Sequence, residues 1–163
     1  MSLEADIALL KRVPLFADLP TEQLRLIAFS AVRLDLVAGQ VLFREGAKAT
    51  CGYVVSSGVL ELTSEEGTGA DATAKIVATC EAGSLIGEVA LFIETKRPAT
   101  AKAIIASQII EIDRKLISRM LNEYPHIAVR LRATLATRLS ATIAELGRVQ
   151  KVLSNIDRMQ PRR

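Results

Sequence analysis

Apolar residues recur with two different periods along this 163-residue chain, and the change of period divides it into three parts. Residues 3–12 and 21–29 carry apolar side chains at helical spacing, so residues 1–30 are predicted to form short helices. Residues 31–113 show short runs rich in Val, Ile and Leu, separated by glycine-containing turns. This second part is predicted to form antiparallel strands that close into a β-barrel or jelly roll.

The helical period returns in the third part, residues 114–156. A first helix covers the segment RKLISRMLNEY, and Pro125 then suits the first turn of one long helix that runs to about Leu153. Seven positions alternate steps of four and three residues, the spacing of a coiled-coil seam: Leu135, Leu139, Thr142, Leu146, Val149, Leu153 and Ile156. The seam favours a homodimer through the C-terminal helix. The alternative is that this stripe packs on the chain's own barrel.

The three parts together predict one domain over residues 1–163, mainly β with flanking helices. Its centre is an antiparallel β-barrel or jelly roll (a double-stranded β-helix), placed between N-terminal helices and a long C-terminal helix. No stretch approaches the ~18 apolar residues that a membrane span needs. Glu4 and Asp6 stand where a secretory signal would be basic. We therefore expect a cytoplasmic protein that does not act in a membrane.

The segment at residues 83–103, GSLIGEVALFIETKRPATAKA, interrupts the strand pattern and carries the candidate chemistry. Gly87 can begin one or two helical turns, and the unpaired backbone N–H groups at such a start can meet an anion. Arg97 comes just before an apolar strand that would hold its guanidinium group inside the barrel. A guanidinium group in that position needs an anionic partner.

Two partners for Arg97 are compatible with the residues alone. Glu88 could form a structural ion pair with it that involves no ligand. Such a pair is a poor source of net stability, because desolvating both charges costs several kcal/mol. The alternative is a site for a phosphorylated sugar, in which Arg97 binds the phosphate and Glu88 accepts a hydrogen bond from a sugar hydroxyl.

The succession of GEVALF and KRPATAKA resembles the phosphate-binding cassette of the cyclic-nucleotide-binding domains. That family includes catabolite activator proteins, regulatory subunits of the cyclic-AMP-dependent kinase and cyclic-nucleotide-gated channels. The upstream run EGAKATCGYVVSSGVLEL is similar to the family's pattern of strands and glycines. The resemblance implies that Glu88 binds the ribose 2′-hydroxyl group and Arg97 the exocyclic phosphate oxygens. The backbone near Gly87 and Ala99 would complete the site.

The segment YPHIAVRLRATLATRLSATIAELG resembles the long central helix of the catabolite activator proteins. This match places Thr142 where their threonine contacts adenine; the alternative is a threonine tolerated in the core. The implied nucleotide-binding residues are Ile86, Gly87, Glu88, Val89, Ala90, Arg97, Pro98, Ala99 and Thr142. A sensor of this type would relay nucleotide occupancy through the C-terminal helix to a protein partner that the sequence does not name.

Three residues depart from the family pattern. Pro98 offers no N–H group, so one phosphate hydrogen bond of roughly 1.5 to 3 kcal/mol is missing. Members selective for cyclic GMP resemble a pattern with threonine at this position, so cyclic AMP is the expected ligand and cyclic GMP the alternative. Ile143 stands where the activator proteins have a serine that binds the base from the partner subunit.

Charge and residue types argue against other functions. Net charge is −5 over residues 1–113 and +8 over residues 114–163, which is typical of a solvated helix face. No helix-turn-helix segment follows the long helix, so DNA binding is not expected. His126 is the only histidine, and Cys51 and Cys80 are expected to be free buried thiols, so no metal, cofactor or catalytic residue is predicted. The chain is therefore not expected to be an enzyme. The main rival is a domain that keeps the fold, has lost the ligand and serves as a scaffold.

Overall fold

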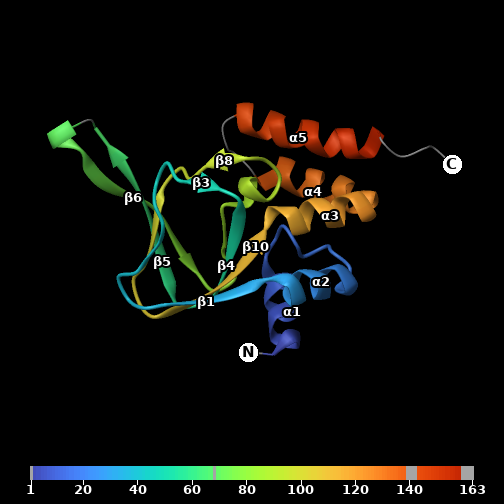
Figure 1. Cartoon of the computed structure of the whole chain (residues 1–163), viewed down its shortest axis with the longest axis horizontal. Coiled ribbons are helices and arrows are strands. Elements are labelled where there is room, and N and C mark those ends of the chain that lie inside the picture. Colours follow the sequence, from blue (N-terminus) through green and yellow to red (C-terminus); the bar gives the residue numbers. More distant parts are fainter. Residues whose placement is uncertain (1, 68, 139–142, 159–163) are drawn as a thin grey trace.

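The computed structural model describes residues 2–67, 69–138 and 143–158. Strands from the middle of the chain form the barrel, and helices from both ends gather on one side of it (Figure 1). The helices are α1 (Leu3–Arg12), α2 (Thr21–Ser30), α3 (Arg114–Glu123), α4 (Pro125–Arg138) and α5 (Ile143–Arg158), with 3₁₀ turns η1 (Gly69–Asp71) and η2 (Glu88–Leu91). The predicted fold class, mainly β with flanking helices, is confirmed.

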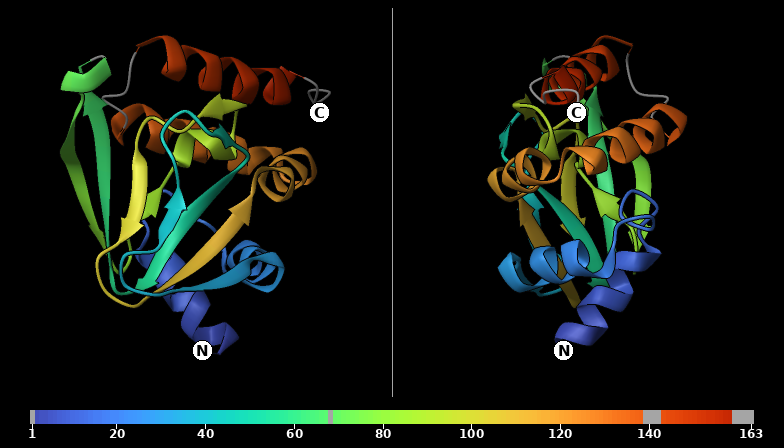
Figure 2. Two further views of the ribbon diagram at one scale, coloured as in Figure 1. Left: turned by 60° about the vertical axis from the view of Figure 1, so that its left-hand side comes forward. Right: turned by 90° about the vertical axis from the view of Figure 1, so that its right-hand side faces the viewer.

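The strands pair in three antiparallel sheets, two of which enclose the barrel interior (Figure 2). The first sheet has the order β1 (Val32–Leu36), β10 (Ser107–Asp113), β4 (Cys51–Ser57), β7 (Leu85–Ile86). The second has the order β2 (Val41–Phe43), β9 (Thr100–Ala103), β5 (Val59–Glu66), β6 (Thr73–Glu81). The third joins β3 (Lys48–Ala49) to β8 (Thr95–Lys96).

The alternation of side chains along β4 and β10 divides the apolar core into two clusters. Tyr53, Val55 and Ile109 belong to the cluster inside the barrel, whose other members come from both large sheets. Val54 and Ile110 belong to the cluster that packs against the helices. Successive side chains of a strand point to opposite faces, so β4 and β10 at the centre of the first sheet are buried on both sides, whereas β1 at its edge is largely exposed. This explains why β4 and β10 contain runs of consecutive apolar residues.

The C-terminal part differs from the single long helix that the sequence predicts. Helix α4 ends at Arg138 and α5 begins at Ile143. Nη1 of Arg132 lies 3.2 Å from Oγ of Ser154, 22 residues further along the chain. On one straight α-helix these residues would be about 33 Å apart. The prediction of one continuous helix is therefore wrong, and α5 lies back along α4, as Figure 1 shows.

The apolar stripe of the predicted seam explains why α5 lies against the rest of the molecule. Leu135, Val149 and Leu153 are at most 1% exposed and belong to the same core cluster as the barrel-facing helices. Burying them within the chain is favourable, because each removes apolar surface from water. Three other positions of the seam fall outside the described residues or side chains: Leu139, Thr142 and Leu146. The described stripe packs on its own chain, and the homodimer stays a prediction.

Candidate functional site

Gly87 joins strand β7 to the 3₁₀ turn η2 beside the barrel interior. Strand β7 pairs with β4, with Ile86 opposite Tyr53, and this pairing fixes where the chain turns. The backbone of Gly87 has φ of 75°, a left-handed conformation that favours glycine. A Cβ atom here would also lie 2.4 Å from Nη1 of Arg97. Glycine is thus required both by the backbone and by the closeness of a guanidinium group.

Backbone hydrogen bonds hold Arg97 beside the loop between β2 and β3. The N–H group of Arg97 donates to the carbonyl oxygen of Ala47, and the N–H group of Gly46 donates to the carbonyl oxygen of Arg97, each at 2.8 Å. The preceding residues of β8 pair with β3, so the segment is held on both sides of the arginine. Gly46 and Arg97 are 51 residues apart in the sequence. The position of the Arg97 backbone, from which the side chain extends, is therefore set by the tertiary fold.

The guanidinium group of Arg97 lies inside the barrel and is 4% exposed. Its Nη2 donates to the carbonyl oxygen of Cys51 at 2.8 Å and lies 3.4 Å from the Cys51 sulfur. Its Cζ is 4.3 Å from the ring centre of Phe43 and 5.0 Å from that of Tyr53. Attraction between a cation and the face of an aromatic ring is strongest where water is excluded. Two stacked rings and one carbonyl group therefore fix the position of this cation.

None of these partners is a carboxylate group. The described residues include no carboxylate in an ion pair with Arg97, so the structural pair with Glu88 that the sequence allowed is not formed. The Nε and Nη1 atoms of Arg97 are buried and make no hydrogen bond with the described residues. A buried charge without a counter-ion is costly, and so is each unsatisfied donor. The site is therefore electrostatically suited to an anion.

A cavity of about 260 Å³ lies against Arg97. Seven of the nine residues that the sequence singles out line it: Ile86, Gly87, Glu88, Val89, Ala90, Arg97 and Pro98. Ala99 is buried next to them without lining the cavity. Thr142 and the side chain of Ile143 lie outside what the structure describes. Two charged side chains of opposite sign, Glu88 and Arg97, thus line one cavity without forming a pair with each other.

Sequence reasoning missed the residues that support the site from other strands. Ala49, Leu62, Leu85, Thr95 and Lys96 also line the cavity. The guanidinium group of Arg97 is in contact with Phe43, Cys51 and Tyr53. The apolar runs VLF and YVVSS placed Phe43 and Tyr53 in strands, and period-two alternation could have pointed them inward, whereas Cys51 lay outside these runs. Nothing in the sequence could have shown that they meet Arg97, about 50 residues away.

Tyr53 and Cys80, two ionisable side chains of the barrel cluster, stay uncharged at neutral pH. Burial, followed by a hydrogen bond with Cys51, raises the pKa of the Tyr53 phenol well above its ordinary value, although Arg97 acts in the opposite sense. Burial also raises the pKa of the Cys80 thiol, which belongs to the same barrel cluster. Neither group supplies a negative charge to Arg97. The positive charge of the guanidinium group is therefore left for a ligand.

Helix α5 lies against residues 92–94, which belong to the segment between Gly87 and Arg97. Nη2 of Arg148 donates to the carbonyl oxygen of Glu94 at 3.1 Å. A cleft of about 420 Å³ between the two segments is lined by Phe92, Ile93 and Glu94 on one side and by side chains of α5 on the other. The segment that contains Gly87 and Arg97 is thus in direct contact with the C-terminal helix.

The described residues hold no group of three or more His, Cys, Asp or Glu side chains that could bind a metal ion. None of the described helices combines the length and the apolar character that crossing a membrane would require.

Known proteins resemble this chain in sequence and fold. The model of the cyclic nucleotide-binding domain matches residues 33–124. A cyclic nucleotide-binding-like protein from Brucella abortus is 39% identical, with a TM-score of 0.63 over 71% of this chain and 97% of that one. The N-terminal domain of a transcriptional regulator from Streptomyces coelicolor A3(2) is 32% identical, with a TM-score of 0.71 over 80% of this chain and 89% of that one.

Among curated proteins, the lysophospholipase NTE1 of Chaetomium globosum is 31% identical over 117 residues, which are 72% of this chain and 8% of the lysophospholipase. The chain thus spans less than a tenth of the length of that relative. The family model covers more than half of the chain, and its match includes both Glu88 and Arg97. The chain belongs to the cyclic nucleotide-binding domain family.

Proposed function

We propose that this chain is a non-catalytic regulatory module that binds a cyclic nucleotide, cyclic AMP by preference, in the cavity beside Arg97. Nη1 and Nε of Arg97 donate to the phosphate oxygens, and Glu88 accepts a hydrogen bond from the ribose 2′-hydroxyl group. The observation that carries the proposal is a buried guanidinium group with two unused donors and no carboxylate partner among the described residues. A phosphodiester anion supplies the missing charge and the missing acceptors.

Five of the other predicted residues line the cavity: Ile86, Gly87, Val89, Ala90 and Pro98. Ile86, Gly87, Val89 and Ala90 follow the backbone turn beside the phosphate, and Pro98 and Ala99 continue from Arg97. Pro98 has neither an N–H group to donate to the phosphate nor a hydroxyl group to reach a guanine base. This residue supports cyclic AMP over cyclic GMP and a moderate rather than a very high affinity. Thr142 is proposed to contact the base.

Calorimetric titration with cyclic AMP and cyclic GMP tests the proposal. We expect saturable binding of cyclic AMP, weaker binding of cyclic GMP, and loss of binding by more than about a hundredfold in Arg97→Ala, because a charge-assisted pair of hydrogen bonds disappears. Arg119→Ala, which removes an exposed arginine of α3, is the matched control and should bind like the parent chain. Equal binding by Arg97→Ala and Arg119→Ala would refute the site.

The C-terminal helix is proposed to relay occupancy of the site. The contact between Arg148 and Glu94 couples α5 to the cassette, so a ligand that moves the cassette changes the surface on which α5 lies. Hydrogen exchange of the α5 amides with and without cyclic AMP measures this coupling. Unchanged exchange rates throughout residues 143–158 in the nucleotide-saturated protein would show that α5 takes no part in the relay.

The alternative function is a scaffold of the same fold that binds no nucleotide, one domain over residues 1–163 that acts through dimerisation. The titration separates the two, because a scaffold binds neither nucleotide. Light scattering with and without cyclic AMP tests the homodimer separately. No DNA contact and no catalytic step is proposed: Arg97 and Glu88 are placed to bind a ligand, and most of the residues around them are apolar.

A further inference from the structure

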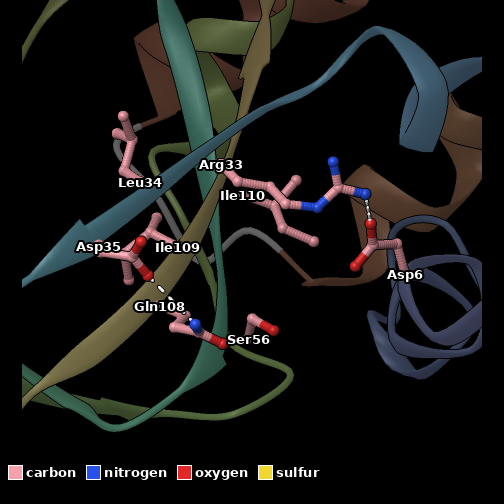
Figure 3. Close-up of a pocket in the computed structure, with 8 residues that line it drawn as sticks. All are labelled: Asp6, Arg33, Leu34, Asp35, Ser56, Gln108, Ile109 and Ile110. Atoms are coloured by element: carbon pink, nitrogen blue, oxygen red, sulfur yellow. Dashed lines mark hydrogen bonds and ion pairs between the residues drawn. The ribbon is translucent and has the colours of Figure 1, made fainter. Parts of the chain in front are cut away.

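A second cavity, of about 200 Å³, lies between helix α1 and the first sheet (Figure 3). It has no lining residue in common with the nucleotide cavity. Its walls come from α1, β1, β4 and β10: Asp6, Arg33, Leu34, Asp35, Ser56, Gln108, Ile109 and Ile110. More than half of these side chains are polar, although the cavity lies beside the apolar cluster under the helices.

Asp6 is the most unusual of these residues, because its side chain is 1% exposed. One carboxylate oxygen, Oδ2, pairs with Nη2 of Arg33, whose side chain is 49% exposed. The other oxygen, Oδ1, is buried and accepts no hydrogen bond from the described residues. Figure 3 shows Oδ1 turned away from Arg33, on the side of the cavity. A buried carboxylate oxygen without a donor is costly, so a donor within the cavity would be favourable.

The charges around the cavity favour a cation as that donor. Asp35 also lines it and accepts a hydrogen bond from Nε2 of Gln108 at 3.1 Å. Two carboxylates and one guanidinium group leave a net charge of −1, and the guanidinium group of Arg33 is already engaged with Asp6. A small group that carries both a positive charge and N–H donors satisfies Oδ1 and balances the charge.

The register of the sheet adds Ser56 to the wall. Gln108 lies opposite Ser57 and Ile109 opposite Val55, so Ser56 is an extra residue on β4 and the strand bulges there. Ser56 also lines a neighbouring cavity of about 290 Å³ along α1, whose other walls include Arg12. At ~30 Å³ for each water, the first cavity holds roughly half a dozen water molecules, which is the size of a short aliphatic amine.

We propose that this second cavity binds a primary ammonium group, which donates to Oδ1 of Asp6 while Asp35 supplies further negative charge. The group belongs either to a small aliphatic amine or to the lysine side chain of another protein, and the chemistry is the same in both. This site is independent of the nucleotide site and of its proposed function.

Titration of the full chain with 1,4-diaminobutane, followed by amide chemical shifts, tests the proposal. We expect saturable shifts centred on Arg33, Ser56 and Gln108, with glycerol as a neutral probe of similar size that causes none. Asp6→Asn should weaken binding by about tenfold or more, because a neutral amide replaces a charge-assisted acceptor. Asp18→Asn makes the same change at an exposed position and should bind like the parent chain.

Asp35→Asn provides a variant at an exposed position that keeps the Asp6–Arg33 pair, in case Asp6→Asn does not fold. We expect it to weaken diaminobutane binding several-fold, and we expect Arg97→Ala to leave this binding unchanged. A lysine blocked at both ends, titrated in the same way, distinguishes a protein side chain from a free amine as the preferred source. Absence of saturable shifts, or equal binding by Asp35→Asn and Asp18→Asn, overturns the proposal and leaves Oδ1 of Asp6 to water.

Discussion

The molecule buries one positive and one negative group in two separate regions, and it treats them differently. Arg97, inside the barrel, is 4% exposed and is held by two aromatic rings and a carbonyl oxygen. Asp6, on the buried face of α1, is 1% exposed and is held by the guanidinium group of Arg33. The first charge is fixed in place without being neutralised, and the second is largely neutralised.

This difference distinguishes an arginine whose N–H donors are open to a ligand from one in a structural ion pair. An aromatic face attracts a guanidinium group but leaves its N–H donors free, whereas a carboxylate occupies both charge and donors. The aromatic support therefore keeps Arg97 ready for an anion. The Asp6–Arg33 pair ties α1 to β1, and only one of its oxygens is left for a ligand.

Among the variants that keep both Arg97 and Asp6, the largest effect is expected from Gly87→Ala. The new Cβ atom would lie 2.4 Å from Nη1 of Arg97, so the guanidinium group has to leave its place. We expect nucleotide affinity to fall by about a hundredfold, and a loss of stability of about 1 to 2 kcal/mol from the left-handed backbone. Gly83→Ala is the matched control, because its φ is 91° and no atom lies within 4 Å. Calorimetry measures the nucleotide affinity of both variants and thermal unfolding measures their stability, so the two effects can be separated. If Gly87→Ala and Gly83→Ala bind the nucleotide equally well, the close approach of residue 87 to Arg97 is refuted.

Arg33→Met tests how much the ion pair with Asp6 contributes to the stability of the fold. Removing the partner of a buried carboxylate leaves an uncompensated charge, which costs about 3 to 5 kcal/mol when both groups are buried. Arg33 is about half exposed, so we expect the free energy of unfolding to fall by about 2 kcal/mol. Denaturant unfolding measures it, with Arg25→Met as the exposed control on α2. Nucleotide affinity should not change, and a change would mean that the two regions are coupled.

Phe43→Leu asks how much the aromatic support contributes. The leucine keeps an apolar contact but removes the ring face 4.3 Å from Cζ of Arg97. We expect nucleotide affinity to fall about fivefold, which is about 1 kcal/mol and within the range of a cation–π contact. Tyr53→Phe keeps the second ring and should bind nearly as well as the parent. If Phe43→Leu also binds as tightly as the parent, the Tyr53 ring and the Cys51 carbonyl oxygen suffice to hold the guanidinium group.

Sequence reasoning was strong where local pattern decides the outcome and weak where distant segments meet. Strand periodicity and the cassette residues predicted the barrel and placed Glu88 and Arg97 in the same segment. Helical periodicity also continued through residues 125–156, because the residues that bury α5 against the core have the spacing of a coiled-coil seam. The same stripe of Val149 and Leu153 serves either arrangement, so spacing alone could not show that α5 lies along α4. The contact of Phe43 with Arg97 is likewise set by barrel closure.

The smallest effect is expected at the exposed ion pair between Lys48 and Glu94. Nζ of Lys48 lies 2.5 Å from Oε1 of Glu94, and both side chains are more than 60% exposed. The hydrogen bond from Lys48 lowers the pKa of Glu94 below its ordinary value. Such a carboxyl group stabilises the fold above its unfolded pKa and loses that contribution as pH falls through the folded value. Lys48→Met should therefore raise the pKa of Glu94 in a titration followed by carboxyl chemical shifts, whereas Lys115→Met on α3 should not.

Because water already solvates both charges of the Lys48–Glu94 pair, we expect no measurable change in the free energy of unfolding of Lys48→Met. A marked loss of stability in Lys48→Met would mean that exposed pairs here act like Asp6 and Arg33, and burial would no longer explain the difference between the two regions.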